Sequence, residues 1–465
     1  MLAIVSDLHF CDGTATEKNV DPKAFALALG DIYAEAAGLA AQQQGHAHLD
    51  VVMLGDVFDL LRTEAWFAVP PSERPWGSAA ALGNAPAAAA TIGHARRIMS
   101  RITEENAAAL ALLRGETLAP PPGVSVRRIL LPGNHDRLAL HDDGLYAAMR
   151  AAVRADDERT LAAEGIFPHR LEMPQYGLLA RHGHEWDAWN FESHRQDDAH
   201  PRADYEDAAY LPAPIGDPIT TELAARLPFE MKLRLDAIGS LGAEDKDHIY
   251  RRLQRVEDVR PLFASIPWVY REAARLQSVN GGATGSAVEA ALEDALRTVI
   301  ADFRALDFFD AWYAKHNSWH PFNGARKLKA ALAVLSDVTI NTVEHVGPAF
   351  EALFGGDGKE PCTVGAAAER LDHLGAEGMR FVVYGHTHDA VQVALAAADG
   401  ASSSYLNSGT FRQRVFRSED RRGFVSSDYL TYLCFFTEAE ARTWRDPRDR
   451  LVGPAYSAWT GMRNR

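Results

Sequence analysis

The sequence is poor in cysteine and carries no excess of positive charge. Its three cysteines, Cys11, Cys362 and Cys434, lie far apart in 465 residues and form no Cys-x-x-Cys pair. This spacing excludes a disulfide framework and a thiolate zinc site, and it suits a reducing compartment. The formal net charge of −15 at pH 7 argues against a general nucleic-acid binder, because such proteins normally have a basic surface.

Long apolar runs are also lacking, and no stretch approaches the length of a membrane span. The apolar run at residues 2–5 is too short for a signal peptide and has no basic segment before it. We therefore expect a cytoplasmic protein without a transmembrane segment. A chain of 465 residues exceeds what one compact core needs, so we expect a catalytic core with a large insertion.

Short aliphatic runs that end in polar residues are the main pattern present. They occupy residues 2–5, 51–54, 129–131, 178–180 and 381–384. Each run is too short for a helix, and every run after the first has Gly or Pro at one end, which predicts a buried strand. Helical patterns lie between some of them; Asp21 and Pro22, for example, can begin a helix that carries Phe25, Leu29 and Ile32 on one face. Alternating strands and helices predict an α/β core with its site at the carboxyl ends of the strands.

The part of the chain between His182 and His386 is mostly helical in pattern. We predict that residues 1–204 and 356–465 form the catalytic core and that 205–355 form a helical insertion acting as a lid or cap. Within it, Ser286 and Glu289 match a capping box and predict the start of a helix. The aromatic-rich stretch 308–322 is interpreted as helical core, with a lid wall against an apolar substrate as the alternative.

Five polar blocks follow the predicted strands in one order along the chain. They are Asp7-Leu8-His9, Gly55-Asp56-Val57-Phe58-Asp59, Gly133-Asn134-His135-Asp136, His182-Gly183-His184 and Gly385-His386-Thr387-His388. Any one block occurs by chance as a solvated loop or turn, but five in order after strands do not. Carboxylate, imidazole and amide ligands suit Mn²⁺, Fe, Zn²⁺ or Mg²⁺. Asp56 comes directly after a strand and Gly55, where its carboxylate can bridge two ions.

The five blocks resemble the ordered signature of the calcineurin-like metallophosphoesterases, which reads DxH, GDxxD, GNH(D/E), a lone His and GHxH. The resemblance covers residues 1–190 and 376–440 and implies two mixed β-sheets packed as a sandwich flanked by helices. It also implies two divalent metal ions, with Mn²⁺ expected. By that pattern one ion is bound by Asp7, His9, Asp56 and His388, and the other by Asp56, Asn134, His182 and His386.

The resemblance implies hydrolysis of a phosphate ester, phosphodiester or pyrophosphate by a hydroxide that bridges the two ions. His135 is predicted to protonate the leaving oxygen, and Asp59 to orient His135. His184 is predicted to lie behind the ligands, because only one histidine of its block is expected to bind metal. A scaffold without metal is the weakest alternative, since all seven ligands are present.

Two runs, Gly55-Asp56-Val57-Phe58-Asp59 and His182-Gly183-His184-Glu185-Trp186-Asp187, look similar to the UDP-2,3-diacylglucosamine hydrolase-like subgroup, which cuts a pyrophosphate under a helical lid. The chain departs from that subgroup at His135, where its best-known members have Arg, and in a much longer insertion. We therefore expect only a phosphate-containing small molecule or nucleotide-linked substrate. The alternative is a nuclease of the same superfamily acting on DNA or RNA. A basic cluster could supply its phosphate contacts, although a solvated face is the commoner explanation of such a cluster; it consists of Arg412, Arg414, Arg417, Arg421 and Arg422.

Overall fold

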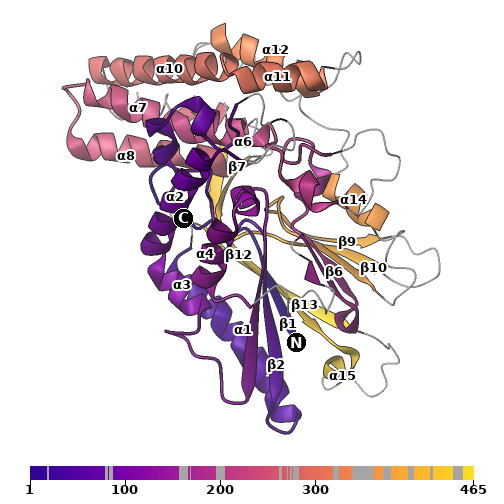
Figure 1. The fold of residues 1–465 in the computed structure, drawn as a ribbon. Coiled ribbons are helices and arrows are strands. Elements are labelled where there is room, and N and C mark those ends of the chain that lie inside the picture. Colours follow the sequence, from indigo (N-terminus) through magenta and orange to yellow (C-terminus); the bar gives the residue numbers. More distant parts are fainter. Residues whose placement is uncertain are drawn as a thin grey trace.

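The computed structural model describes most of the chain, and the fold is presented for these residues. They are 1–17, 20–78, 82, 87–156, 166–167, 169–194, 205–260, 264–265, 267–269, 271–272, 275, 282–317, 324–337, 361–369, 379–395, 403–418, 423–442 and 454–464. They form two β-sheets with helices outside them and a body of stacked helices at one end (Figure 1).

A seven-stranded sheet carries the first three predicted strands. Its order is β3-β2-β1-β12-β11-β7, with β13 also paired to β12. Strands β1, β2 and β3 run parallel, whereas β1 and β12 run antiparallel. The strands are β1 (Leu2–Val5), β2 (Ala47–Leu54), β3 (Val124–Leu131), β7 (Val259–Arg260), β11 (Gln413–Arg417), β12 (Phe424–Phe436) and β13 (Ala455–Asn464).

A six-stranded sheet carries the other two predicted strands, in the order β4-β5-β6-β8-β10-β9. Strands β6, β8 and β10 are parallel, and β5 and β9 join them antiparallel. The strands are β4 (Ile166–Phe167), β5 (Arg170–Met173), β6 (Leu178–Ala180), β8 (Phe381–Tyr384), β9 (Ala390–Leu395) and β10 (Ser403–Ser408). Both sheets are therefore mixed, and the predicted α/β class is confirmed.

Apolar side chains of the two sheets share one core. Along β1, Leu2 and Ile4 belong to the cluster that contains Leu178 and Val383 of the other sheet. The alternate residues of β1 belong instead to the cluster that includes the helices outside the sheet. This alternation follows from the two-residue period of a strand. The shared core is compatible with the expected sandwich.

Helices cover the outer face of the seven-stranded sheet. Helix α1 (Pro22–Gln42) begins at Asp21, whose side chain accepts a hydrogen bond from the Lys23 amide, and it buries Phe25, Leu29 and Ile32 as predicted. By length and composition α1 could span a membrane, but 44% of its apolar window is buried in the protein. A core helix passes the same test, so the absence of a transmembrane segment stays a prediction. The other helices of this part are α2 (Ala89–Glu105), α3 (Ala107–Leu113), α4 (Asp143–Val153) and α15 (Glu438–Ala441).

The helices of residues 216–337 pack around a core of their own. Phe308, Phe309 and Trp312 are buried in it, which confirms the interpretation of these residues as helical core; Trp319 and Phe322 lie outside the described residues. The helices are α6 (Gly216–Pro218), α7 (Arg226–Asp236), α8 (Ala243–Leu253), α10 (Gly282–Arg304), α11 (Asp307–His316) and α12 (Gly324–Asp337), and α14 (Pro361–Glu369) follows them in the chain.

This helical body is joined directly to the seven-stranded sheet. Strand β7 lies within residues 205–355, yet it pairs in parallel with β11. The predicted end of the insertion at 355 falls outside the described residues. The predicted helix start at Ser286 is wrong, because α10 begins at Gly282. In this first turn, Thr284 Oγ1 lies 3.1 Å from Ser240 Oγ.

Candidate metal centre

The predicted ligands lie on loops that directly follow buried strands, and the loops hold one another. The Asp7 amide donates to the Gly55 carbonyl over 3.1 Å, and the His9 amide donates to the Asp56 carbonyl over 2.8 Å. The loops after β1 and β2 are thereby joined, as expected for neighbouring parallel strands that end at one edge of a sheet.

The backbone of five predicted ligands is in the left-handed region. The φ angles are 52° at Asp7, 45° at His9, 49° at Asp56, 67° at His386 and 62° at His388. Among the described residues only two other non-glycine residues have a positive φ. Such conformations cost on the order of 1–3 kcal/mol each and cluster at functional sites. The strain therefore marks the predicted ligands as a group.

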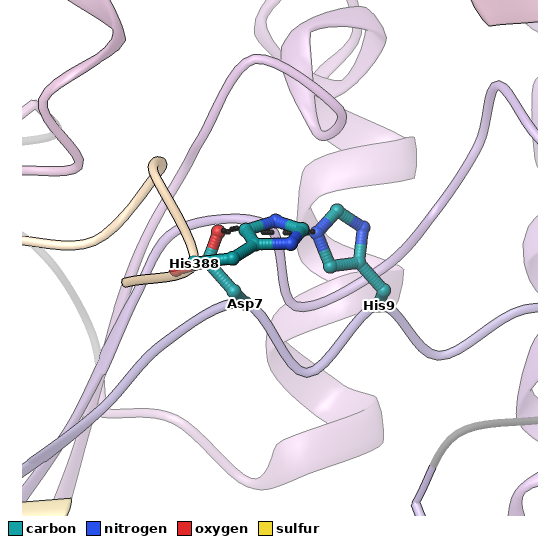
Figure 2. A group of neighbouring side chains, drawn as sticks. All are labelled: Asp7, His9 and His388. Atoms are coloured by element: carbon teal, nitrogen blue, oxygen red, sulfur yellow. Dashed lines mark hydrogen bonds and ion pairs between the residues drawn. The ribbon is translucent and has the colours of Figure 1, made fainter. Parts of the chain in front are cut away.

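One cluster consists of Asp7, His9 and His388 (Figure 2). His388 Nε2 lies 3.2 Å from Asp7 Oδ1 and 3.1 Å from His9 Nε2. Asp7 Oδ1 is buried and has no hydrogen-bond partner among the described residues. Burial raises the pKa of Asp7 to about 6. A buried carboxylate oxygen that faces two imidazole nitrogens and accepts no hydrogen bond fits a cation site.

A second cluster consists of Asp56, His182 and His386. His182 Nε2 lies 3.2 Å from Asp56 Oδ2 and 3.2 Å from Asn134 Oδ1. His182 Nδ1 donates to the Leu54 carbonyl over 3.0 Å, which leaves Nε2 as the electron-pair donor. Burial would lower the pKa of His182, but Asp56 raises it to about 10. The negative field that favours an imidazolium here equally favours a metal cation.

Asp56 lies between the two clusters. Its Oδ2 is 3.2 Å from His182 Nε2 and 3.8 Å from His9 Nε2. Its Oδ1 accepts a hydrogen bond of 2.8 Å from the His135 amide. Gly133 makes this approach possible, because a Cβ at that position would overlap Asp56 Oδ1. One carboxylate thus faces both groups of ligands.

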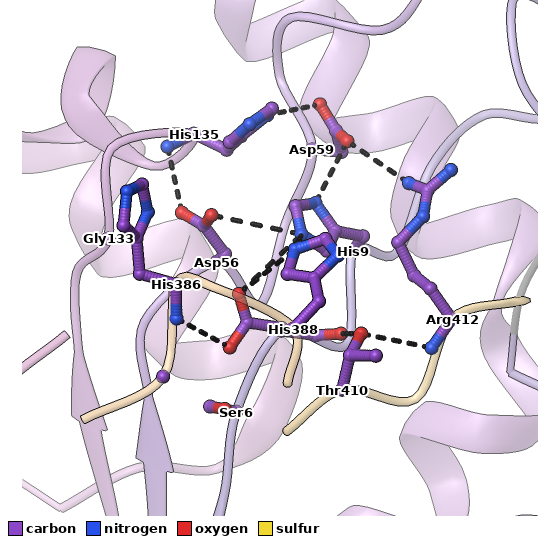
Figure 3. A network of polar contacts seen from close by, with 12 residues as sticks. Ser6, His9, Asp56, Asp59, Gly133, His135, His386, His388, Thr410 and Arg412 are labelled. Atoms are coloured by element: carbon purple, nitrogen blue, oxygen red, sulfur yellow. Dashed lines mark hydrogen bonds and ion pairs between the residues drawn. The ribbon is translucent and has the colours of Figure 1, made fainter. Parts of the chain in front are cut away.

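The two residues predicted to act in proton transfer are in contact (Figure 3). Asp59 Oδ1 lies 3.0 Å from His135 Nδ1, and Asp59 Oδ2 lies 3.0 Å from His9 Nδ1. Burial would lower the pKa of His135, but the neighbouring carboxylates Asp59 and Asp56 raise it above the ordinary value of a histidine. His135 also belongs to a third group with His9 and Asp56 that can hold an ion. The geometry therefore allows His135 to be either a proton donor or a ligand.

Two residues of the predicted blocks lie behind the ligands. His184 belongs to none of the metal-type groups of the described residues, and burial lowers its pKa to about 3. Asp136, for which no role was predicted, accepts hydrogen bonds from the amides of Val57, Phe58 and Gly133. The side chain of Asp136 therefore fixes the loop that carries Asp56 against the loop that carries Asn134.

The first arginines of the predicted basic cluster are not exposed. Arg412 is 1% exposed and pairs with Asp258 of the helical body at 2.7 Å. Arg414 is 4% exposed and donates to the His388 carbonyl over 2.9 Å. Arg421 and Arg422 lie outside the described residues. The burial of Arg412 and Arg414 leaves the nuclease alternative with less support.

Two further residues near the second cluster were not predicted. Asp187 Oδ2 lies 3.1 Å from His386 Nε2, and Asn190 Oδ1 lies 3.5 Å from Asn134 Nδ2. Both belong to the loop after the short helix His184–Trp186. Asp187 ends the run from His182 that resembles the hydrolase subgroup, whereas for Asn190 closeness in sequence to His182 was the only signal available.

No protein-family model matches this chain, and a search of curated proteins gives no significant match.

Proposed function

We propose that this protein is a phosphoesterase of the calcineurin-like superfamily that depends on two divalent metal ions. The observation that carries the proposal is the position of Asp56 Oδ2, 3.2 Å from His182 Nε2 and 3.8 Å from His9 Nε2. When bound, two ions activate a water as nucleophile and neutralise charge on the phosphoryl oxygens. The two mixed sheets with a shared core support the sandwich fold of that superfamily.

Each group of ligands has its own part in this proposal. One ion is held by Asp7, His9 and His388, the other by Asn134, His182 and His386, and Asp56 contributes to both. Mn²⁺ is the ion that we propose, because the donors are oxygen and imidazole nitrogen without thiolate.

In this proposal His135 donates the proton to the leaving oxygen, and Asp59 orients His135. Asp59 accepts from His135 Nδ1, so His135 Nε2 is the nitrogen that remains to protonate the leaving oxygen. The raised pKa of His135 supports this role, since a general acid must carry its proton at the start of the reaction.

The substrate that we propose is a small phosphate-containing or nucleotide-linked molecule in a reducing cytoplasm. The net charge of −15 and the burial of Arg412 and Arg414 favour it over nucleic acid. The three cysteines are buried and form no disulfide bond with one another, which supports a reducing compartment.

The test is a screen of the protein stripped by chelation and reloaded with Mn²⁺, Fe²⁺, Zn²⁺ or Mg²⁺. The substrates are a nitrophenyl monoester and diester, nucleotides, UDP-sugars and single-stranded DNA. We expect chelation to abolish hydrolysis and Mn²⁺ to restore it best. Hydrolysis by the stripped protein would refute the proposal, and turnover of DNA alone would replace it with the nuclease function. Asp56→Asn is the inactive control.

A further inference from the structure

The loop 187–190 connects two predicted ligands of the second cluster through hydrogen bonds. Asp187 accepts from the Trp189 amide at Oδ1 over 2.9 Å and from Asn190 Nδ2 at Oδ2 over 2.7 Å. It also lies 3.1 Å from His386 Nε2, and Asn190 reaches Asn134. We infer that Asp187 and Asn190 are positioning residues that decide which atoms of His386 and Asn134 face the second ion. This inference rests on the proposed metal centre.

The first half of the argument concerns the tautomer of His386. An ionised carboxylate only accepts hydrogen bonds, so His386 Nε2 must carry the hydrogen that it shares with Asp187. The other nitrogen, Nδ1, then has the free electron pair. His386 belongs to the group with Asp56 and His182, whereas Asp187 belongs to none of the metal-type groups of the described residues. Asp187 therefore acts through His386, in the arrangement by which carboxylates orient metal-binding histidines.

The second half concerns the amide of Asn134. An amide can present its oxygen or its nitrogen, and only the oxygen binds a cation. Because Asn190 gives its nitrogen to Asp187, its oxygen is the atom that faces Asn134, at 3.5 Å from Asn134 Nδ2. Asn134 Oδ1 is then left on the side of His182 Nε2, 3.2 Å away. Because the Asp187 carboxylate can only accept hydrogen bonds, it sets the orientation of the side-chain amides of Asn190 and Asn134.

The loop is also fastened to the helical body. The Gly216 amide at the start of α6 donates to the Trp189 carbonyl over 2.7 Å, and a Cβ on Gly216 would overlap Asn190 Oδ1. The Trp189 ring lies 6.3 Å from the ring of Trp312 in α11. The loop 187–190 therefore connects the helical body to the second cluster.

The experiment compares Asp187→Ala and Asn190→Ala with the wild-type protein. The first readout is titration of the stripped protein with Mn²⁺. We expect two binding steps in the wild type. In each variant, the Mn²⁺ affinity of one step should fall by about 10–100-fold, and that of the other should stay unchanged. Asp207→Ala is the matched control, since Asp207 is a nearby carboxylate whose side chain is 89% exposed, and it should titrate as the wild type.

The second readout is the ¹⁵N spectrum of the histidine-labelled, metal-free protein. We expect His386 to be protonated at Nε2 in the wild type and to show a mixture of tautomers in Asp187→Ala. Two unaltered Mn²⁺ steps with an unaltered tautomer in both variants would overturn the inference and leave the proposed function intact. A wild type that binds no Mn²⁺ would refute the proposed function, and the ¹⁵N spectrum would still decide the positioning role of Asp187. Thermal unfolding of each variant controls for the fold, and either variant suffices if the other does not fold.

Discussion

At the scale of single residues, the site depends on strained backbone and on close approach as much as on ligand type. The sequence predicted seven ligands through the resemblance of its five ordered blocks to the metallophosphoesterases, and the structure brings the seven residues into two adjoining clusters. The sequence could not predict that Asp187 contacts His386 and that Asn190 contacts Asn134. These contacts depend on how a loop turns, and the sequence pattern of a loop does not fix its course.

The position of Asp56 gives a prediction about metal content. Asp56→Asn should lower the affinity for both ions, because one carboxylate faces both clusters, with Oδ2 3.2 Å from His182 Nε2 and 3.8 Å from His9 Nε2. His388→Ala should lower mainly the affinity for the ion beside Asp7. Elemental analysis of each variant at equal free Mn²⁺ measures this. Full retention of two ions in Asp56→Asn would contradict the bridging position.

The contact between His135 and Asp59 gives a prediction about leaving groups. An alkoxide needs a proton to leave, whereas nitrophenolate does not. His135→Ala should keep its metal and lose about 10²–10⁴-fold in kcat/KM with an alkyl ester, but less with a nitrophenyl ester. Asp59→Asn should show the same pattern more weakly. Equal losses with both esters, accompanied by loss of metal, would make His135 a ligand.

At the scale of elements, the strands were easier to predict than the helices. The predicted strands 2–5, 178–180 and 381–384 match β1, β6 and β8, because short buried strands are continuous apolar runs. The helices are less regular, and α2 ends just before Asn106, whose side chain donates to the Ile102 carbonyl, and α3 begins after it. The helix start predicted at Ser286 is wrong, since α10 already begins at Gly282.

The buried pair between Asp258 and Arg412 gives a prediction about stability. The two side chains are 3% and 1% exposed, and they join the helical body to β11 beside Asp59. Asp258→Ala should lower the free energy of unfolding in urea by about 3–5 kcal/mol, since it leaves a buried arginine without its main partner. Asp247→Ala removes the exposed partner of Arg251 and is the control, for which we expect no measurable change. Equal unfolding curves for the two variants would show that the pair does not stabilise the fold.

At the scale of the whole molecule, the α/β class followed from strands and helices in alternation. The pairing of distant strands did not follow, because it depends on contacts between residues far apart in the chain. Strand β7 is the clearest example, since a two-residue strand inside a helical segment carries no signal of its own. Its pairing with β11, and Val415 of β11 in the core of the helical body, make that body part of the folded molecule.

The contacts between the helical body and β11 give a prediction about deletion of that body. Deletion of residues 205–355 should give no soluble, folded protein, because it exposes Val415 and removes Asp258 from beside Arg412. Soluble yield and circular dichroism measure the outcome. A soluble deletion variant that still hydrolyses a nitrophenyl ester would instead make the segment a separable lid.

Anomalous scattering from crystals grown in saturating Mn²⁺ tests whether two metal ions share Asp56. We expect two peaks about 3.5–4 Å apart, one beside Asp7 and His388 and one beside Asn134 and His182, with Asp56 touching both. A single peak, or two peaks without Asp56 between them, would contradict this expectation.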